Sequence, residues 1–333
     1  MSKPPIEVPQ GAIRFNIDSQ RMELYSQDQW WEIESDLNNP LGGRGLYGGG
    51  WPASKTVIDM ITITTAGNSV EFGNLSISRQ EGGACGGEIR GYWAANAIPN
   101  AASIDVVSFG NGGTATDFGD ITQNRQTPGG GANRTRGVWC GGYGPSPTQW
   151  VKTIDYIELA VTGVAQDFGD LSERTNGASC ANNSVRGVVT LGANQPSTSS
   201  SNIIDVINLA TTGDAVDFGD ATIGQKRRAP VSSSTRAVWS AGHLSTNHID
   251  YVEIATMGDA TDFGDMTRTT SYDMFSASTC VRGTFGAGGF PSTSSEIEYI
   301  TIPTKGDSVD FGGLTHSDAL IMLGNCSNAH GGL

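Results

Sequence analysis

The chain of 333 residues has few basic residues and no long hydrophobic run. It holds 20 Lys and Arg against 34 Asp and Glu, and its net charge of −14 disfavours a nucleic-acid partner, which needs clustered cations. The best basic cluster, Lys226–Arg228, is short. No apolar segment is long enough to span a bilayer, and the polar, Pro-rich start does not have the pattern of a signal peptide. We therefore expect neither nucleic-acid binding nor membrane insertion.

Residues that commonly carry chemistry are also scarce. The five cysteines form an odd set without a C-x-x-C pair, which disfavours a disulfide framework or a zinc site and favours buried thiols in a reducing cytoplasm. The four histidines form no H-E-x-x-H pattern. Cys85 lies in a Gly-rich stretch but has no strand–turn–helix context and no partner histidine. The sequence predicts no catalytic residue, no metal site and no cofactor.

Glycine is abundant, with 46 residues, and one segment returns in six versions. The version at 212–222 is TGDAVDFGDAT, and each version is preceded by an isoleucine, an acid and an apolar residue. Self-similarity at a period of 45 to 50 residues, in strand-like units, indicates a propeller or a related repeat architecture. The isoleucines that mark the period are Ile58, Ile104, Ile154, Ile204, Ile249 and Ile297.

Each repeat supplies four predicted strands: one opened by an arginine, one with the Ile-acid pair, one with D-F-G-D, and one of small residues. Small side chains suit the crowded innermost strand of a propeller. The repeat region lacks a small-residue strand at its start, and residues 317–333 supply one at its end. The expected fold is thus all-β, a six-bladed β-propeller over residues 44–333 that the C-terminal strand closes. The arginines are Arg44, Arg90, Arg136, Arg186, Arg236 and Arg282.

The N-terminal part differs from the repeats. Residues 1–10 contain three prolines and predict an extended arm, residues 11–35 predict a three-stranded β meander, and residues 36–43 form a linker. Such a meander is marginal alone, so its apolar residues need another surface to cover them. We expect these residues to serve attachment to another protein or assembly of a homo-oligomer; they are Phe15, Leu24, Tyr25, Trp30 and Trp31.

The D-F-G-D motif is predicted to be architectural. Its phenylalanine is expected to pack between neighbouring sheets, and the glycine that follows marks a bulge or a close backbone approach. Its first acid is expected to pair with an arginine or to cap a turn, and a Ca²⁺ site is disfavoured because D-x-x-D offers too few oxygens. The phenylalanines are Phe72, Phe118, Phe168, Phe218, Phe263 and Phe311; the acids are Glu71, Asp117, Asp167, Asp217, Asp262 and Asp310.

The connections after the Gly-Gly strands vary in length and composition, whereas the turns after the Ile-acid strands do not. In a four-stranded blade the variable connections share a face with the links between blades. Irregular loops on a rigid scaffold are the usual place for recognition. Trp51, Tyr143, Trp150 and Phe290 lie in or beside these loops. They either stack on a sugar or anchor a protein partner, or fold back onto their own blade, and the sequence leaves both open.

An Arg-led strand ending in Gly-Gly, then an Ile-Asp strand, a turn and D-F-G-D-L-T-x-x-R, resembles the kelch type of β-propeller over residues 44–333. It departs from that pattern by having Phe where kelch repeats have Tyr and Trp. The D-F-G-D-L-T variety, combined with the G-x-I-R-F-N meander, is similar to structural proteins of tailed bacteriophages.

The resemblance implies a non-enzymatic virion protein, assembled in the host cytoplasm, with other virion proteins as partners. The expected role is a tail fibre or appendage whose propeller recognises a host-cell surface glycan or protein. The alternative is a capsid or tail decoration or connector protein with a purely structural role. A glycan-degrading enzyme is the third hypothesis, disfavoured because the acids recur once per repeat and do not form one acid/base pair.

Overall fold

The computed structural model describes residues 8–16, 21–26, 28–32, 43–51, 55–97, 100–145, 149–194, 199–240, 242–270, 274–286, 288–289, 294–315 and 324–333. Every regular element in these ranges is a β-strand. The fold is therefore all-β, as predicted. Since the described residues form no helix, they contain none that could cross a membrane.

The chain divides into two compact units, Met1–Pro40 and Leu41–Leu333. The first unit holds an antiparallel sheet of three strands, β1 (Ile13–Asn16), β2 (Arg21–Ser26) and β3 (Gln29–Glu32). Across β2 and β3, Tyr25 lies opposite Trp30, and their ring centroids are 5.2 Å apart. The Arg14 guanidinium lies 4.0 Å from the Trp30 ring centroid. The Tyr25 and Trp30 rings thus cover part of each other.

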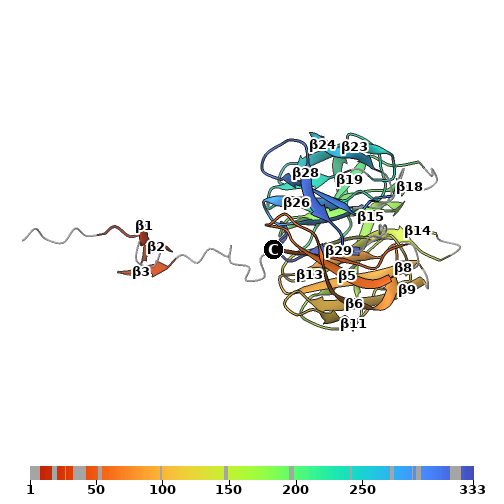
Figure 1. The fold of residues 1–333 in the computed structure, drawn as a ribbon, viewed down its shortest axis with the longest axis horizontal. Helices are drawn as coiled ribbons and strands as arrows, with labels where there is room; N and C mark the ends of the chain where they lie inside the picture. The colour runs from red at the N-terminus through yellow and green to blue at the C-terminus, as the bar shows by residue number, and fades with distance from the viewer. Residues whose placement is uncertain are drawn as a thin grey trace, which may run out of the picture. The chain divides into compact units, whose positions relative to one another are not determined.

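In the described part of the second unit, the strands form six sheets, drawn in Figure 1. Each contains, in order across the sheet, a small-residue strand, an Arg strand, an Ile-Asp strand and a DFG strand. Sheet I is β29 (Gly324–Ser327), β4 (Arg44–Gly48), β5 (Lys55–Thr62) and β6 (Val70–Arg79), with β10 (Gly113–Thr114) added beside β6. Sheet II is β7 (Gly83–Gly86), β8 (Arg90–Ala97), β9 (Asn100–Ser108) and β11 (Thr116–Asp120).

The other four sheets repeat this order. Sheet III is β12 (Gly129–Ala132), β13 (Arg136–Tyr143), β14 (Trp150–Glu158) and β15 (Gln166–Asn176), with β18 (Ala193–Asn194) beside β15. Sheet IV is β16 (Ser179–Asn182), β17 (Arg186–Thr190), β19 (Ile203–Asn208) and β20 (Val216–Asp220). Sheet V is β21 (Pro230–Ser232), β22 (Arg236–Trp239), β23 (Thr246–Glu253) and β24 (Thr261–Thr270). Sheet VI is β25 (Phe275–Ser278), β26 (Arg282–Gly286), β27 (Glu296–Thr301) and β28 (Val309–Gly313).

Because the four main strands are antiparallel, each sheet has two distinct ends. The turn end carries the links from small-residue to Arg strand and from Ile-Asp to DFG strand. The loop end carries the variable connections from Arg to Ile-Asp strand and the links from one sheet to the next. The second unit begins at the turn end, where the Arg44 N–H donates to Asn328 Oδ1 at 2.7 Å.

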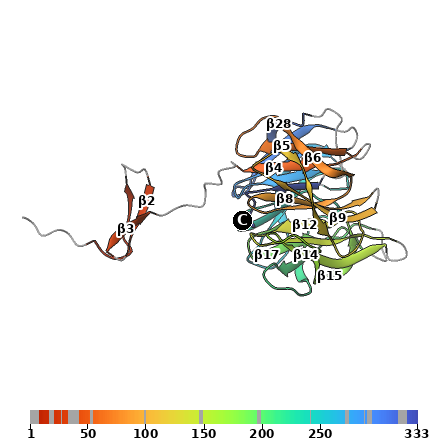
Figure 2. The ribbon, with the colours of Figure 1, turned by 90° about the horizontal axis from the view of Figure 1, so that it is seen from below.

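Apolar side chains fill the seams, by which we mean the contact regions between neighbouring sheets. The described residues form six such clusters, and each contains one phenylalanine of the DFG motif. In one seam Phe311 of β28 shares a cluster with Ile61 of β5, two strands far apart in sequence that are both labelled in Figure 2. Phe118, Phe168, Phe218, Phe263 and Phe311 are buried, and Phe72 is half-buried against its cluster.

The glycine after this phenylalanine fits both roles that the sequence predicts. The ladder between β14 and β15 shifts register beside Gly169, which is a bulge. Gly169 has a φ of 142°, and a Cβ placed there would lie 2.4 Å from the carbonyl oxygen of Gly213 in the next sheet. On the same seam the Asp170 N–H donates to Asp214 Oδ1 at 2.9 Å. A side chain at position 169 would therefore push two sheets apart.

The arginines that open the Arg strands bind the neighbouring sheet. Arg136 Nη1 donates to the carbonyl oxygens of Leu209 and Ala210, which follow the Ile-Asp strand of sheet IV, at 3.3 and 2.9 Å. Its Nε donates to Glu158 Oε1 at 2.8 Å within its own sheet. Equivalent bonds across seams are made by Arg44, Arg186, Arg236 and Arg282.

The buried acid of each repeat is not the one that the sequence predicts. Asp117, the first acid of D-F-G-D, is exposed, because side chains alternate along the strand and Phe118 takes the covered side. The buried acid is that of the Ile-Asp strand. Asp155 is fully buried, its Oδ2 lies 2.8 Å from Arg125 Nη2, and its Oδ1 accepts from Thr122 Oγ1 at 2.6 Å. The predicted carboxylate–arginine pair thus exists, but with a different carboxylate.

Candidate functional site at the loop end

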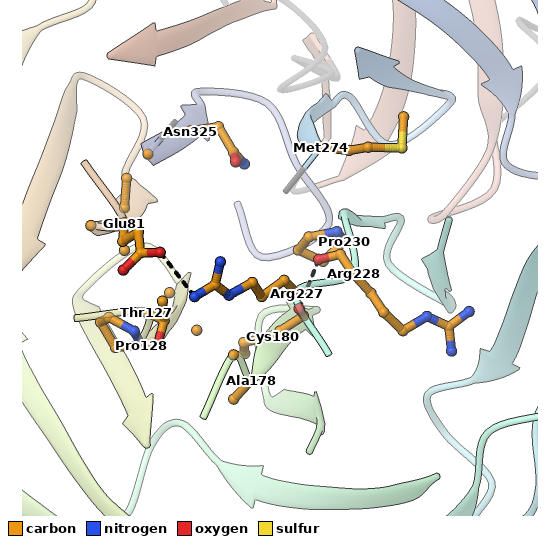
Figure 3. A pocket seen from close by; sticks show the side chains of 18 residues that line it. Glu81, Thr127, Pro128, Ala178, Cys180, Arg227, Arg228, Pro230, Met274 and Asn325 are labelled. Atoms are coloured by element: carbon orange, nitrogen blue, oxygen red, sulfur yellow. Dashed lines mark hydrogen bonds and ion pairs between the residues drawn. The ribbon is translucent and has the colours of Figure 1, made fainter. Parts of the chain in front are cut away.

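The small-residue strands begin at the loop end, and their first residues surround a depression. Gly83, Gly129 and Ser179 line it together with residues of the sheet-to-sheet links. It measures about 600 Å³ when the space open to solvent is included. Figure 3 shows this depression, which we call the mouth, with its lining side chains. Glycine, alanine and serine make up much of the wall, so the charged side chains at the rim dominate its chemistry.

The rim is formed by equivalent positions on the links that lead into sheets II to V, each nine residues before the arginine that opens the Arg strand. Glu81, Thr127, Gly177 and Arg227 hold these positions, and all four have left-handed backbones with φ of 57°, 55°, 75° and 60°. Arg227 Nη2 and Glu81 Oε1 form an ion pair of 2.9 Å between links of different sheets (Figure 3). The rim is thus a repeated backbone position with a different side chain in each of these links, as a recognition surface needs.

The basic cluster at 226–228 is largely neutralised. Arg228 is buried and points away from Glu81 in Figure 3, and it pairs with Asp250. Arg227 forms an ion pair with Glu81. Burial, together with Lys226 and Arg227, lowers the pKa of His243, which keeps that imidazole neutral near pH 7. The mouth therefore offers hydrogen-bonding groups and one ion pair, without a strong excess of positive charge.

The four aromatic residues predicted at the loops have different surroundings. Trp51 is 46% exposed at the loop end of sheet I. Tyr143 is half-buried and lies opposite Trp150 where β13 pairs with β14. Trp150 is buried, so its side chain is not available to a partner. Phe290 lies outside the described residues.

No family model and no curated protein matches the chain. A search of solved structures does find similar folds, among them the structure of YjhT. That match has a TM-score of 0.60 and covers 74% of this chain and 87% of the YjhT chain at 10% sequence identity. The chain has a β-propeller-like fold. At this identity the likeness concerns the fold alone and says nothing about what the propeller binds.

The apolar residues predicted for attachment all belong to the N-terminal sheet. Leu24, Tyr25 and Trp30 are half-buried there. Phe15 and Trp31 lie on β1 and β3, and their side chains are outside what the structure describes.

The cysteines of the propeller lie mostly in its interior. Four of the five cysteines are buried, and all five are free thiols. Burial raises the pKa of the Cys85 thiol, which disfavours the thiolate that a nucleophile requires. Within the described ranges, no group of three His, Cys, Asp or Glu side chains is placed to hold a metal ion.

Sequence reasoning did not identify the rim positions. The signal was present, because Glu81, Thr127, Gly177 and Arg227 each stand nine residues before the arginine of an Arg strand and differ in chemistry. Loop positions that vary from repeat to repeat on a rigid scaffold are typical of a surface that is free of packing constraints.

Proposed function

We propose that the propeller has six blades and is closed by its C-terminal strand. Six sheets in the described part of the second unit support the blade number. The pairing of β29 with β4, in which Gly324 lies opposite Gly48, supports closure. Further support comes from the small-residue strands, which lie against one another in the succession β7, β12, β16, β21, β25 and β29, and β29 in turn lies against β7.

We propose that the chain is a bacteriophage virion protein, a tail fibre or other appendage that recognises the host without catalysis. The N-terminal sheet would attach it to the particle or to copies of itself. The loop end of the propeller would contact a glycan or a protein on the host cell. Several copies on one particle would compensate for weak individual contacts.

The separation of the two ends of the sheets carries this proposal. The chain enters the second unit at the turn end, beside Arg44 and Asn328. The variable loops, exposed Trp51 and the mouth with Glu81 and Arg227 all belong to the loop end. A tether at one end leaves the other end free to meet a partner.

Immunogold electron microscopy tests the location, with an antibody against the full chain and tailed-phage particles whose genome encodes it. Label on the tail or its appendages is expected. Label on the head would favour the decoration role, and particles without label would exclude a virion protein.

Binding of the labelled full chain to host cells then tests recognition: attachment should fall about tenfold or more on Trp51→Ala, in line with an aromatic anchor. The exposed Val164→Thr variant at the turn end should bind like the wild type.

One observation favours the second candidate, a decoration or connector protein. Ile89, Val185 and Val281 precede the arginines of sheets II, IV and VI and are 64%, 52% and 56% exposed at the turn end. In sheets III and V the equivalent residues are threonines. Apolar side chains repeated on one end of a propeller suit packing against another virion protein.

A further inference from the structure

The acids of the Ile-Asp strands have similar surroundings from sheet to sheet, and the surroundings of one acid differ. Five of these acids can be compared, and each accepts a hydrogen bond from the backbone N–H of the Ser or Thr that ends the motif [DE]-F-G-[DN]-x-[ST] in the preceding sheet. This N–H orients the carboxylate but does not neutralise it. The pairs of donor and acceptor are Ser76 with Asp105, Thr122 with Asp155, Ser172 with Asp205, Thr222 with Asp250, and Thr267 with Glu298.

In four of the five environments a guanidinium balances the buried charge. Burying a carboxylate without a counter-charge is costly, so a cation at this point stabilises the fold. The cation comes from different positions in the chain, yet it reaches the same place beside the acid. The ion pairs are Arg79 with Asp105 at 3.2 Å, Arg125 with Asp155 at 2.8 Å, Arg228 with Asp250, and Arg268 with Glu298 at 3.2 Å.

Asp205 of β19 forms no such ion pair among the described residues. The position that Arg125 holds in the preceding repeat is Thr175, whose Oγ1 accepts the Gly192 N–H at 2.8 Å. Asp205 is 0% exposed. Its Oδ2 accepts the Ser172 N–H at 2.8 Å, whereas its Oδ1 is buried without a hydrogen-bond partner in the described part of the chain.

A second acid lies where another repeat places its arginine. Glu173 occupies the position on β15 that Arg268 occupies on β24. Glu173 and Thr175 are the covered residues in an alternation with exposed Ser172 and Arg174, so their side chains share one side of the strand. Burial raises the pKa of Asp205, the hydrogen bonds from Ser172 lower it in part, and the nearby charges of Asp217 and Glu173 raise it further.

An amide oxygen completes the group. Asn194 Nδ2 donates to Glu173 Oε2 at 2.5 Å and to Ser201 Oγ at 3.0 Å, while Asn194 Oδ1 is a buried atom that also has no partner among the described residues. This environment thus gathers two carboxylates and an amide oxygen, and two of its buried oxygens lack partners.

We propose that a hard divalent cation, such as Ca²⁺, binds between Asp205 and Glu173 and takes the place that a guanidinium has in the other repeats. Carboxylate and amide oxygens are the ligands such ions prefer, and water can complete the coordination. Two carboxylates match the charge of a divalent ion. The site is independent of the proposed role in recognition, since it would stabilise the seam between sheets III and IV.

Metal binding by the full chain is the test. After treatment with EDTA and dialysis, equilibrium dialysis should find one Ca²⁺ or Mg²⁺ bound per chain. The melting temperature should rise by about 5 °C at an ion concentration about 100 times Kd. A wild-type chain that binds neither ion, and that melts at one temperature in EDTA, Ca²⁺ and Mg²⁺, would overturn the proposal.

Three variants assign the site. Asp205→Asn should lose the bound ion, whereas Asp262→Asn, the same change at an exposed acid, should retain it. Glu173→Arg copies the arrangement of Arg268 and should give a folded chain whose melting temperature no longer responds to the ion. Ion binding that survives both Asp205→Asn and Glu173→Arg would place the metal elsewhere and refute this site.

Discussion

The seams between sheets and the loops at the loop end differ in how regularly each repeat makes the same contacts. In the seams, Phe118 and its equivalents, the glycines that follow them and the Arg strands make closely similar contacts from sheet to sheet. At the loop end, Trp51 is exposed while Trp150 is buried, and the rim positions carry an acid, a threonine, a glycine and an arginine. The comparison teaches that the repeat keeps the apolar and backbone contacts of the seams nearly constant, whereas the side chains at the loop end vary from sheet to sheet.

The largest effect should come from breaking a buried ion pair in a seam. Arg125→Met leaves Asp155 buried without its cation and should lower the free energy of unfolding by about 3–5 kcal/mol. The matched change Arg134→Met removes an exposed pair with Glu88 and should lower it by about 0–1 kcal/mol. Urea unfolding of both variants measures the difference. Equal losses would show that seam pairs contribute no more than surface pairs.

Two glycines with similar backbone conformations distinguish the cost of close packing from the cost of backbone strain when alanine replaces glycine. Gly169 and Gly213 have φ of 142° and 156°, but a Cβ at position 169 would collide with Gly213 O, whereas a Cβ at position 213 meets nothing within 4 Å. Gly169→Ala should therefore be less stable than Gly213→Ala by about 1–3 kcal/mol. Chemical denaturation of the two variants checks this. If the two variants are equally stable, the approach of the sheets is not what requires glycine at position 169.

The C-terminal segment contributes a pH-dependent contact. His330 is buried, its Nε2–H donates to the Gly86 carbonyl oxygen at 2.7 Å, and its Nδ1 accepts the Gly332 N–H at 3.1 Å. Burial lowers the pKa of His330. Since the unfolded chain then takes up the proton more readily, stability should fall as the pH drops below about 6.5.

Comparison with His330→Gln isolates this contribution from that of the other titrating groups. The denaturation midpoint of the wild type should fall more between pH 7 and pH 5 than that of the variant. Parallel pH profiles would show that protonation of His330 does not oppose folding.

The smallest effect on stability should come from the loops. Trp51→Ala should change the free energy of unfolding by no more than about 0.5 kcal/mol, because Trp51 is exposed. The same substitution at a buried tryptophan, Trp150→Ala, should lower the free energy of unfolding by about 3–5 kcal/mol. Thermal and chemical unfolding measure both. A large loss for Trp51→Ala would mean that its loop is part of the scaffold.

Much of the fold could be predicted from the sequence, because the repeat reports the contacts that recur. The D-F-G-D motif marks the DFG strands and the bulge at Gly169, and the Arg-led segments mark the strands beside them. The buried acid could not be assigned from the motif alone. Asp117 and Asp155 both recur with the repeat, but Asp155 lies on an internal strand of its sheet and stands between apolar residues, whereas Asp117 begins a DFG strand.

The candidate site was predicted less well, since it depends on single positions. Whether Trp150 is exposed depends on how far β13 and β14 extend, and their extension places it opposite Tyr143. The ion pair of Glu81 with Arg227 joins residues 146 positions apart, and no local pattern announces it. No local pattern marks Asp205 either, because it differs from the other acids only through Glu173 and Thr175, which stand where other repeats have arginines.

The pairing of β29 with β4 also affects how the protein forms. During synthesis from the N-terminus, β4 leaves the ribosome nearly 280 residues before its neighbour, so sheet I has an open edge until the last residues of this sequence arrive. Contacts of such long range slow folding, and an exposed strand edge invites pairing with other chains. The final strand therefore controls when the nascent chain stops being prone to aggregation, a role in timing that is separate from its place in the finished fold.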